Sequence, residues 1–159
     1  MKKIIILVST LLISVSGFSQ SFFEDGLDAN WHKGRRDELR KLMPAKSVSV
    51  FFNNPVKNRT NDVDYSYHPD TDFFYLTGFR EPNAVLVIFG ESRDVNGELV
   101  DELIFVQNRD PDAEMWNGKR LGSEGVIREL GFQKAFVNTD FASKSGINTS
   151  DFDHIFTFS

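Results

Sequence analysis

Carboxylates are concentrated between residues 62 and 72, where the sequence reads Asp-Val-Asp-Tyr-Ser-Tyr-His-Pro-Asp-Thr-Asp. Four carboxylates and one imidazole in this stretch could bind a metal ion. The spacing does not match a helix–loop–helix calcium site. Counted from Asp62, Tyr67 stands where glycine is needed and Phe73 where glutamate is needed. Zinc would need clustered histidine or cysteine, and the histidines stand alone. We therefore favour a hydrogen-bonded loop over a metal site.

Asp62 and Asp64 are two residues apart, so an extended segment would place both carboxylates on one face. Two such groups could divide the acid and base roles of an independent hydrolase, which is one hypothesis for this chain. The simpler interpretation is that they accept hydrogen bonds from nearby backbone amides. The sequence contains no nucleophile elbow and no glycine-rich phosphate loop. The absence of cysteine excludes thiol catalysis and thiolate metal sites.

Trp116 lies in a second polar region, residues 109–122, between acidic residues and the basic pair Lys119-Arg120. Tryptophan is mostly buried because of its size, so one interpretation is that Trp116 packs on a sheet. The other is that it projects as a flat apolar wall for a substrate side chain or a proline ring. The sequence alone leaves both interpretations open.

Alternating strand and helix patterns predict the elements that position these residues. An amphipathic helix ends at Pro44, a continuously apolar run indicates a buried strand, and Asn96-Gly97 suits a hairpin turn. Residues 55–61 are predicted as loop, Ser123 as a helix N-cap and Gly131 as a C-cap. The predicted helices are residues 31–43, 111–118 and 123–130, with a brief fourth helix that Thr139 or Asp140 caps and that ends at Lys144. The predicted strands are 47–52, 84–89, 99–107, 135–138 and 155–158. This order predicts an α/β fold, a mixed sheet with helices on its faces.

Residues 1–19 have the layout of a signal peptide. Lys2 and Lys3 precede an apolar run over residues 4–15, and Gly17 and Ser19 are small residues at the positions that a signal peptidase reads. The run is short for a membrane span, although an uncleaved anchor is the alternative. No cysteine follows it, which argues against a lipoprotein anchor. We therefore predict an exported protein, periplasmic or secreted, with no membrane attachment after cleavage.

Cleavage after Ser19 would leave 140 of the 159 residues and, with both lysines removed, would change the net charge from −5 to −7. This length is enough for one domain with its own core. The acidic charge argues against nucleic acid as a partner, because phosphate binding needs a basic face. Without disulfides, stability must come from packing, to which the 16 phenylalanines contribute.

Two motifs occur in a fixed order. Residues 70–82 read Asp-Thr-Asp-Phe-Phe-Tyr-Leu-Thr-Gly-Phe-Arg-Glu-Pro, and residues 109–122 read Arg-Asp-Pro-Asp-Ala-Glu-Met-Trp-Asn-Gly-Lys-Arg-Leu-Gly. With Arg35-Arg36, residues 61–65 and residues 84–86, the match extends over roughly residues 32–140. Together they resemble the N-terminal domain of the Xaa-Pro aminopeptidases, or aminopeptidase P, of the creatinase/prolidase-like family.

The resemblance implies a creatinase-like mixed sheet flanked by helices over residues 20–159. In that family a "pita-bread" catalytic domain follows, holds two metal ions, usually manganese, and cleaves the peptide bond before proline. That domain is absent from this sequence, so the resemblance assigns no catalytic, cofactor-binding or metal-binding residue here. It implies that the N-terminal domain aids oligomerisation and covers the active-site mouth, and that Trp116 and Asp62 are the residues closest to substrate.

The resemblance favours the N-terminal, non-catalytic domain of an exported Xaa-Pro aminopeptidase, inactive alone. Its expected partners are the catalytic domain, further copies of the parent protein and proline-containing peptides. The alternative is a stand-alone creatinase-like module that binds a peptide or protein. We interpret the strand at residues 155–158 as cut off, which favours the first hypothesis.

Overall fold

The computed structural model describes residues 26–158. The predicted signal peptide, residues 1–19, lies outside this part of the chain. Within residues 26–158, no helix combines the length and apolar character that a membrane crossing requires.

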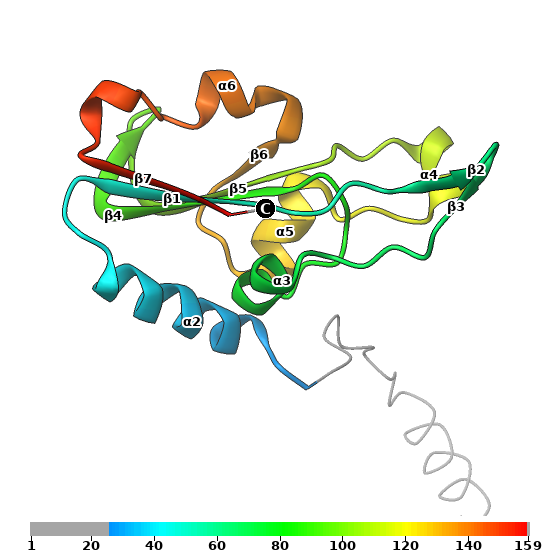
Figure 1. Ribbon diagram of the computed structural model, residues 1–159, viewed down its shortest axis with the longest axis horizontal. Helices are drawn as coiled ribbons and strands as arrows, with labels where there is room; N and C mark the ends of the chain where they lie inside the picture. Colours follow the sequence, from blue (N-terminus) through cyan, green and yellow to red (C-terminus); the bar gives the residue numbers. More distant parts are fainter. Residues whose placement is uncertain (1–25, 159) are drawn as a thin grey trace, which may run out of the picture.

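A five-stranded mixed sheet forms the centre of the fold, in the order β6-β5-β4-β1-β7 (Figure 1). β1 and β5 each pair antiparallel with β4, whereas β7 pairs parallel with β1 and β6 parallel with β5. The strands of the sheet are β1 (Ser47–Phe52), β4 (Val85–Val95), β5 (Glu98–Val106), β6 (Ala135–Val137) and β7 (His154–Phe158). The predicted mixed sheet flanked by helices is confirmed.

β4 is the middle strand, and its apolar run explains why. Leu86 to Phe89 are all buried, as expected for a strand covered on both faces. The strand runs past the predicted end at Phe89 to Val95, with an irregularity between Ile88 and Arg93. Asn96 and Gly97 then make the predicted turn, with φ of 57° and 81°.

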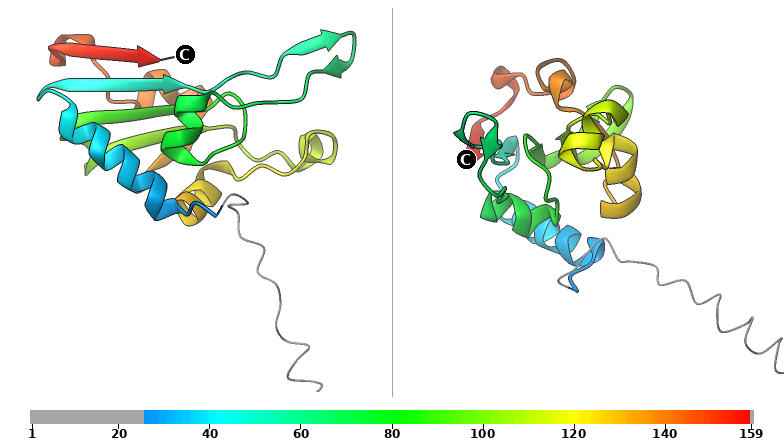
Figure 2. Two further views of the ribbon diagram at one scale, coloured as in Figure 1. Left: turned by 60° about the horizontal axis from the view of Figure 1, so that its bottom comes forward. Right: turned by 90° about the vertical axis from the view of Figure 1, so that its right-hand side faces the viewer.

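Side-chain alternation along the strands separates two apolar layers. On one face, Leu86 and Ile88 pack with Ile104 of β5 and with Phe73 and Val126 from two helices. This face carries α2 (Ala29–Leu42), α3 (Thr71–Thr77) and α5 (Gly122–Leu130). On the other face, Val87 and Phe89 pack with Phe105 and with partly buried aromatic residues. That face carries the short α6 (Phe141–Lys144) and the following segment (Figures 1 and 2).

A buried ion pair anchors α2. Arg36 donates from Nε to Glu102 Oε2 at 2.7 Å and from Nη2 to Glu102 Oε1 at 2.9 Å. Its Nη1 donates to the carbonyl of Leu76 at 2.8 Å, and its guanidinium lies 4.1 Å from the centre of the Phe132 ring. One side chain therefore connects α2 to the sheet, to α3 and to the segment after α5.

Two local expectations need correction, and one helix was missed. Residues 55–61, predicted as loop, contain β2 (Asn58–Thr60), which pairs with β3 (Val63–Asp64). The sequence patterns had assigned no element to the segment that forms α3. Ser123 is not an N-cap, because α5 already begins at Gly122 and Leu121 holds the cap position. Gly131 ends α5 with a φ of 70°, as predicted.

Candidate functional site

Two arms project from the same end of the sheet (Figure 1 and the left view of Figure 2). The hairpin arm, residues 54–70, follows β1 and carries β2 and β3; the helical arm, residues 107–121, follows β5 and carries α4 (Pro111–Asn117). Both strands run antiparallel to β4 and therefore parallel to each other. Their C-terminal ends consequently meet at one edge, which places both arms there.

The helical arm is capped at both ends of α4. Asp110 accepts hydrogen bonds from the amides of Asp112 at 3.0 Å and Ala113 at 3.2 Å, and Pro111 occupies the first turn. Gly118 ends the helix with a φ of 78°. These features confirm the helix predicted for this segment.

Glu114 joins the two legs of the helical arm. Its carboxylate accepts from Arg109 Nε at 2.9 Å and Nη2 at 2.8 Å, before the helix, and from the backbone amide of Arg120, after it. The Arg109 hydrogen bonds, with the Arg120 amide and the charges of Arg109 and Lys119, lower the pKa of Glu114 to about 2, against burial, which raises it. The Glu114 side chain is only 8% exposed, so the carboxylate that joins the two legs is buried within the arm.

Trp116 does not pack on the sheet. The residue is 86% exposed, and its neighbour Met115 is 78% exposed. Two large apolar side chains therefore face solvent on a short helix held in place by Glu114. Single exposed apolar residues are common, but a tryptophan fixed in this way is suited to contact another surface.

Asp62 lies at the other arm, exposed in the turn between β2 and β3. Asn61 makes this turn with a φ of 46°. The side-chain nitrogen of Asn58, Nδ2, donates to the carbonyl of Asn61 at 3.0 Å and to Asp64 Oδ1 at 3.1 Å. The Tyr65 amide donates to the carbonyl of Lys57 at 2.9 Å. The hairpin thus presents Asp62 at its tip through local hydrogen bonds.

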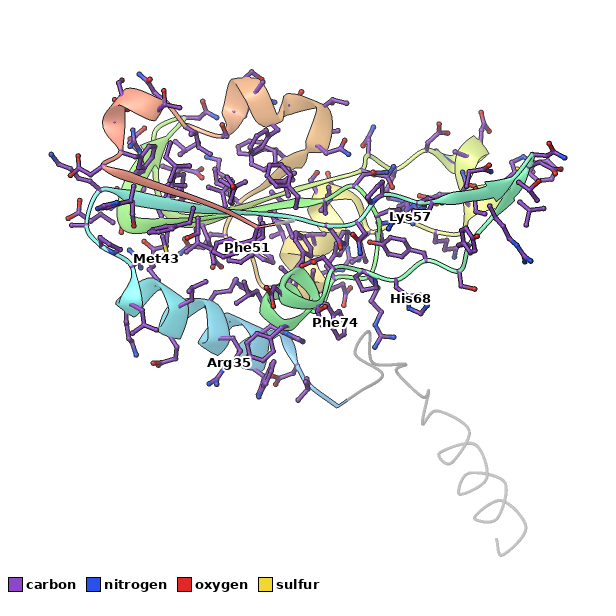
Figure 3. All side chains as sticks on the ribbon, viewed as in Figure 1. Arg35, Met43, Phe51, Lys57, His68 and Phe74 are labelled. Atoms are coloured by element: carbon purple, nitrogen blue, oxygen red, sulfur yellow. The ribbon has the colours of Figure 1, made fainter. Side chains whose placement is uncertain are left out.

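The four carboxylates of residues 62–72 do not assemble a metal centre. Asp64 bonds to Asn58, and Asp70 caps α3 by accepting from the Phe73 amide at 2.9 Å. Lys57 and His68 lie on the two legs of the hairpin arm (Figure 3). Among residues 26–158, no three histidine, aspartate or glutamate side chains are placed to share an ion. The described residues do not fit a metal ion, so no metal-dependent step can be derived from them.

Each arm borders a hollow. The one beside the helical arm has a volume of about 360 Å³ and is lined by residues of the arm and of 137–139, including Glu114 and Asn138. The one along the hairpin arm has a volume of about 390 Å³ and is lined by residues such as Lys57, Tyr65 and His68. Neither Trp116 nor Asp62 lines a hollow, but the hollows border the two arms that carry these residues, which makes this end of the molecule the candidate binding surface.

The comparison with protein families identifies this architecture. The model of the aminopeptidase P N-terminal domain matches residues 32–154. The chain therefore belongs to the aminopeptidase P N-terminal domain family, as its two motifs had indicated.

Individual relatives agree with this assignment. The Xaa-Pro aminopeptidase of Haemophilus influenzae is 37% identical over 110 residues, which cover 69% of this chain and 24% of the relative. Aminopeptidase P from Escherichia coli with the inhibitor Pro-Leu superposes with a TM-score of 0.71 at 29% identity, over 81% of this chain and 28% of that chain. A zinc-substituted Escherichia coli aminopeptidase P in complex with product gives a TM-score of 0.63 at 32% identity, over 71% and 25% of the two chains.

This chain thus spans about a quarter of the length of the relatives that it matches. Sequence patterns identified Trp116 and Asp62 as candidates but missed the side chains that position them. The role of Glu114 in joining the two legs depends on the fold, because the chain must return from α4 to bring the Arg120 amide beside its carboxylate.

Proposed function

We propose that this chain is the non-catalytic N-terminal domain of an exported Xaa-Pro aminopeptidase, and that its two arms help to close the active-site mouth. In this proposal the catalytic domain is a separate part of the parent enzyme and holds its metal, two manganese ions. That domain releases the residue before proline from a peptide. The domain described here supplies Trp116 and Asp62 as contacts for the peptide, in its own subunit or in a neighbouring copy.

The observation that carries the proposal is the exposure of Trp116 on a helix that Glu114 holds in place. An apolar ring that is 86% exposed gains most by packing against another apolar surface, and the pyrrolidine ring of a proline is one such surface. Rigid attachment of α4 lowers the entropy lost when the ring is covered. Asp62, at the tip of the other arm, is suited to attract the amino group of a peptide by charge.

An assay of the purified chain, residues 20–159, tests the non-catalytic assignment. The chain is mixed with an Xaa-Pro peptide and Mn²⁺, and release of the first residue is followed. We expect no release, because the described residues form no metal site. Release that survives removal of contaminating peptidases and is lost in Asp62→Asn would favour the independent hydrolase instead.

A stand-alone binding module is the second candidate, and the exposure of Met115 and Trp116 is compatible with it. The two candidates differ in whether the isolated chain binds peptide by itself. Isothermal titration calorimetry with a proline-containing peptide separates them, because the heat of binding can be measured with or without Trp116. Micromolar binding that Trp116→Ala abolishes would favour the module, whereas we expect the isolated domain to bind at most weakly. Reading the coding sequence beyond Ser159 gives an independent answer.

A further inference from the structure

The bases of the two arms meet at a pair of polar residues, Asn53 and Glu81. Asn53 follows β1 and is only 6% exposed. Its Oδ1 accepts hydrogen bonds from the amide of Asn54 at 3.0 Å and from the amide of Asp70 at 2.8 Å. These are the first and last residues of the hairpin arm. One side-chain oxygen therefore closes the base of that arm.

The same side chain reaches the loop that carries Glu81. Asn53 Nδ2 donates to the carbonyl of Glu81 at 2.8 Å, and the Asn53 amide donates to the carbonyl of Ala84 at 2.9 Å. Glu81 then reaches the helical arm, because its Oε1 accepts from the amide of Leu121 at 2.8 Å. Leu121 is the last residue of that arm. A continuous set of contacts thus runs from one arm base to the other.

We propose that Asn53 and Glu81 act as positioning residues that couple the two arms, so that loss of the contact at one arm base loosens the other. The purpose of this coupling rests on the function proposed above, since it would hold Trp116 and Asp62 in one arrangement toward a shared ligand. The coupling itself is a property of this chain and is open to measurement without any ligand.

The environment of the junction makes its contacts sensitive to change. A buried polar group that loses its hydrogen-bond partner carries the full desolvation penalty. Asn53 and the amides bonded to it therefore favour the arrangement in which these hydrogen bonds are kept. Glu81 Oε2 is buried without a hydrogen-bond partner among the described residues. Burial raises the pKa of the Glu81 carboxyl, opposed by the Leu121 amide and the charge of Arg120. The hydrogen bond from the Leu121 amide to Oε1 is therefore the contact that holds this partly buried carboxyl in place.

The simpler account is that each residue caps its own neighbour. Leu121 holds the N-cap position of α5, whose first amides need acceptors, and Glu81 could serve that need alone. Asn53 could likewise close the hairpin arm alone. The two accounts predict different effects of substitution. Under coupling, a change at Asn53 also affects the Leu121 amide, and a change at Glu81 also affects the Asp70 amide.

Residue-resolved hydrogen exchange of the purified chain tests this difference. The reporters are the amides of Asp70 and Leu121, with the amides of β4 and β5 as internal controls. We expect Asn53→Ala to raise the exchange rate of the Leu121 amide about tenfold, although that amide bonds to Glu81 and not to Asn53. We expect Glu81→Ala to do the same at Asp70, while the β4 and β5 amides keep their rates.

Glu81→Gln is the matched control, because its amide oxygen keeps an acceptor for Leu121 without the charge. We expect it to leave both reporter amides within about twofold of the unmodified chain. Changes confined to the direct partners, Asp70 for Asn53→Ala and Leu121 for Glu81→Ala, would overturn the coupling. So would a loss of protection in β4 and β5 of the same size, since that would be general destabilisation.

The unmodified chain provides a second measurement if the alanine variants do not fold. Exchange of the Asn54, Asp70 and Leu121 amides is followed at low denaturant concentrations. A junction that opens as one unit gives all three amides the same opening free energy and the same denaturant dependence. Different values at Asp70 and Leu121 would overturn the proposal. Neither measurement involves peptide, so a result that overturns the coupling would leave the proposed function standing.

Discussion

Arg109 and Glu114 form a two-pronged ion pair across the helical arm, with Nε–Oε1 and Nη2–Oε2 distances of 2.9 and 2.8 Å. Trp116 is two residues further along α4, so the pair holds the helix that carries the tryptophan. The amide of Arg120 completes the arrangement from the returning leg. The helix that carries the exposed tryptophan is thus held by an ion pair and a backbone hydrogen bond.

Replacing Glu114 should loosen this arm. In a Trp31→Phe background, where Trp116 is the remaining tryptophan, Glu114→Gln should lower the fluorescence anisotropy of Trp116, because the charged fork to Arg109 is lost. Glu124→Gln, at an exposed position of α5, is the control and should leave the anisotropy unchanged. Equal anisotropy in all three proteins would contradict the role of Glu114.

The same pair gives a pH dependence. The pKa of Glu114 is lowered from 4.5 to about 2, so its stabilising contribution is fully present above pH 4.5 and is lost as the pH falls toward 2. The anisotropy of Trp116 should therefore decrease over that interval, and Glu114→Gln should remove that component of the decrease. Far-UV circular dichroism identifies the pH at which the whole domain unfolds. A decrease that follows only this unfolding, identically in both proteins, would argue against the assignment.

The buried pair Arg36–Glu102 should dominate the stability of the α2 attachment. Removing one partner leaves an uncompensated buried charge, so Glu102→Ala should lower the free energy of unfolding by about 3–5 kcal/mol. Arg36→Ala should lower it at least as much, because Arg36 also bonds to Leu76 and lies on Phe132. Urea unfolding measures both effects.

The half-exposed pair Lys33–Asp37 on the same helix is the control for that prediction. Its nitrogen and oxygen atoms also lie 2.7 Å apart, but both side chains are solvated. Asp37→Ala should therefore change the free energy of unfolding by no more than about 1 kcal/mol. Comparable losses in Asp37→Ala and Glu102→Ala would show that burial does not set the difference.

Gly122 fixes the end of the helical arm against α5. It has a φ of 64°, and an added Cβ would lie 2.8 Å from Cγ of Arg109, the residue that pairs with Glu114. Gly122→Ala should thus lower the free energy of unfolding by about 1–3 kcal/mol. Gly34, within α2, has open space around it, and Gly34→Ala should raise the stability by about 0.5–1 kcal/mol. Thermal melts of the two variants should move in opposite directions, and a shift in the same direction would contradict this reading of Gly122.

Sequence patterns predicted the centre of the fold because its signals are strong and local. The apolar run of β4 and the turn at Asn96-Gly97 each have few alternative structures. The hairpin arm gave no such signal, since every residue of β2 and β3 is exposed and the strands show no alternation. α3 is too short for a clear helical period, although Asp70 and Gly78 at its ends are capping residues.

The positioning groups of the candidate site depend on tertiary contacts and were therefore hidden. Glu81 stood in the motif Glu-Pro, but its bond to Leu121 joins residues forty positions apart. The exposure of Trp116 likewise could not be read from composition, because the same residue on the same helix could have packed inward. The order of motifs along the chain predicted the family, whereas the folded chain reveals how those motifs meet.

The measurement that most directly tests the central claim compares Trp116→Ala with Met115→Ala in a protein that joins this domain to its proposed catalytic domain. Both side chains are exposed on α4, so neither change should alter stability by more than about 0.5 kcal/mol. We predict that Trp116→Ala lowers kcat/KM for an Xaa-Pro peptide about tenfold and that Met115→Ala changes it less than about twofold. Equal kcat/KM values for Trp116→Ala and the unmodified enzyme would contradict the claim that this arm presents Trp116 to the substrate.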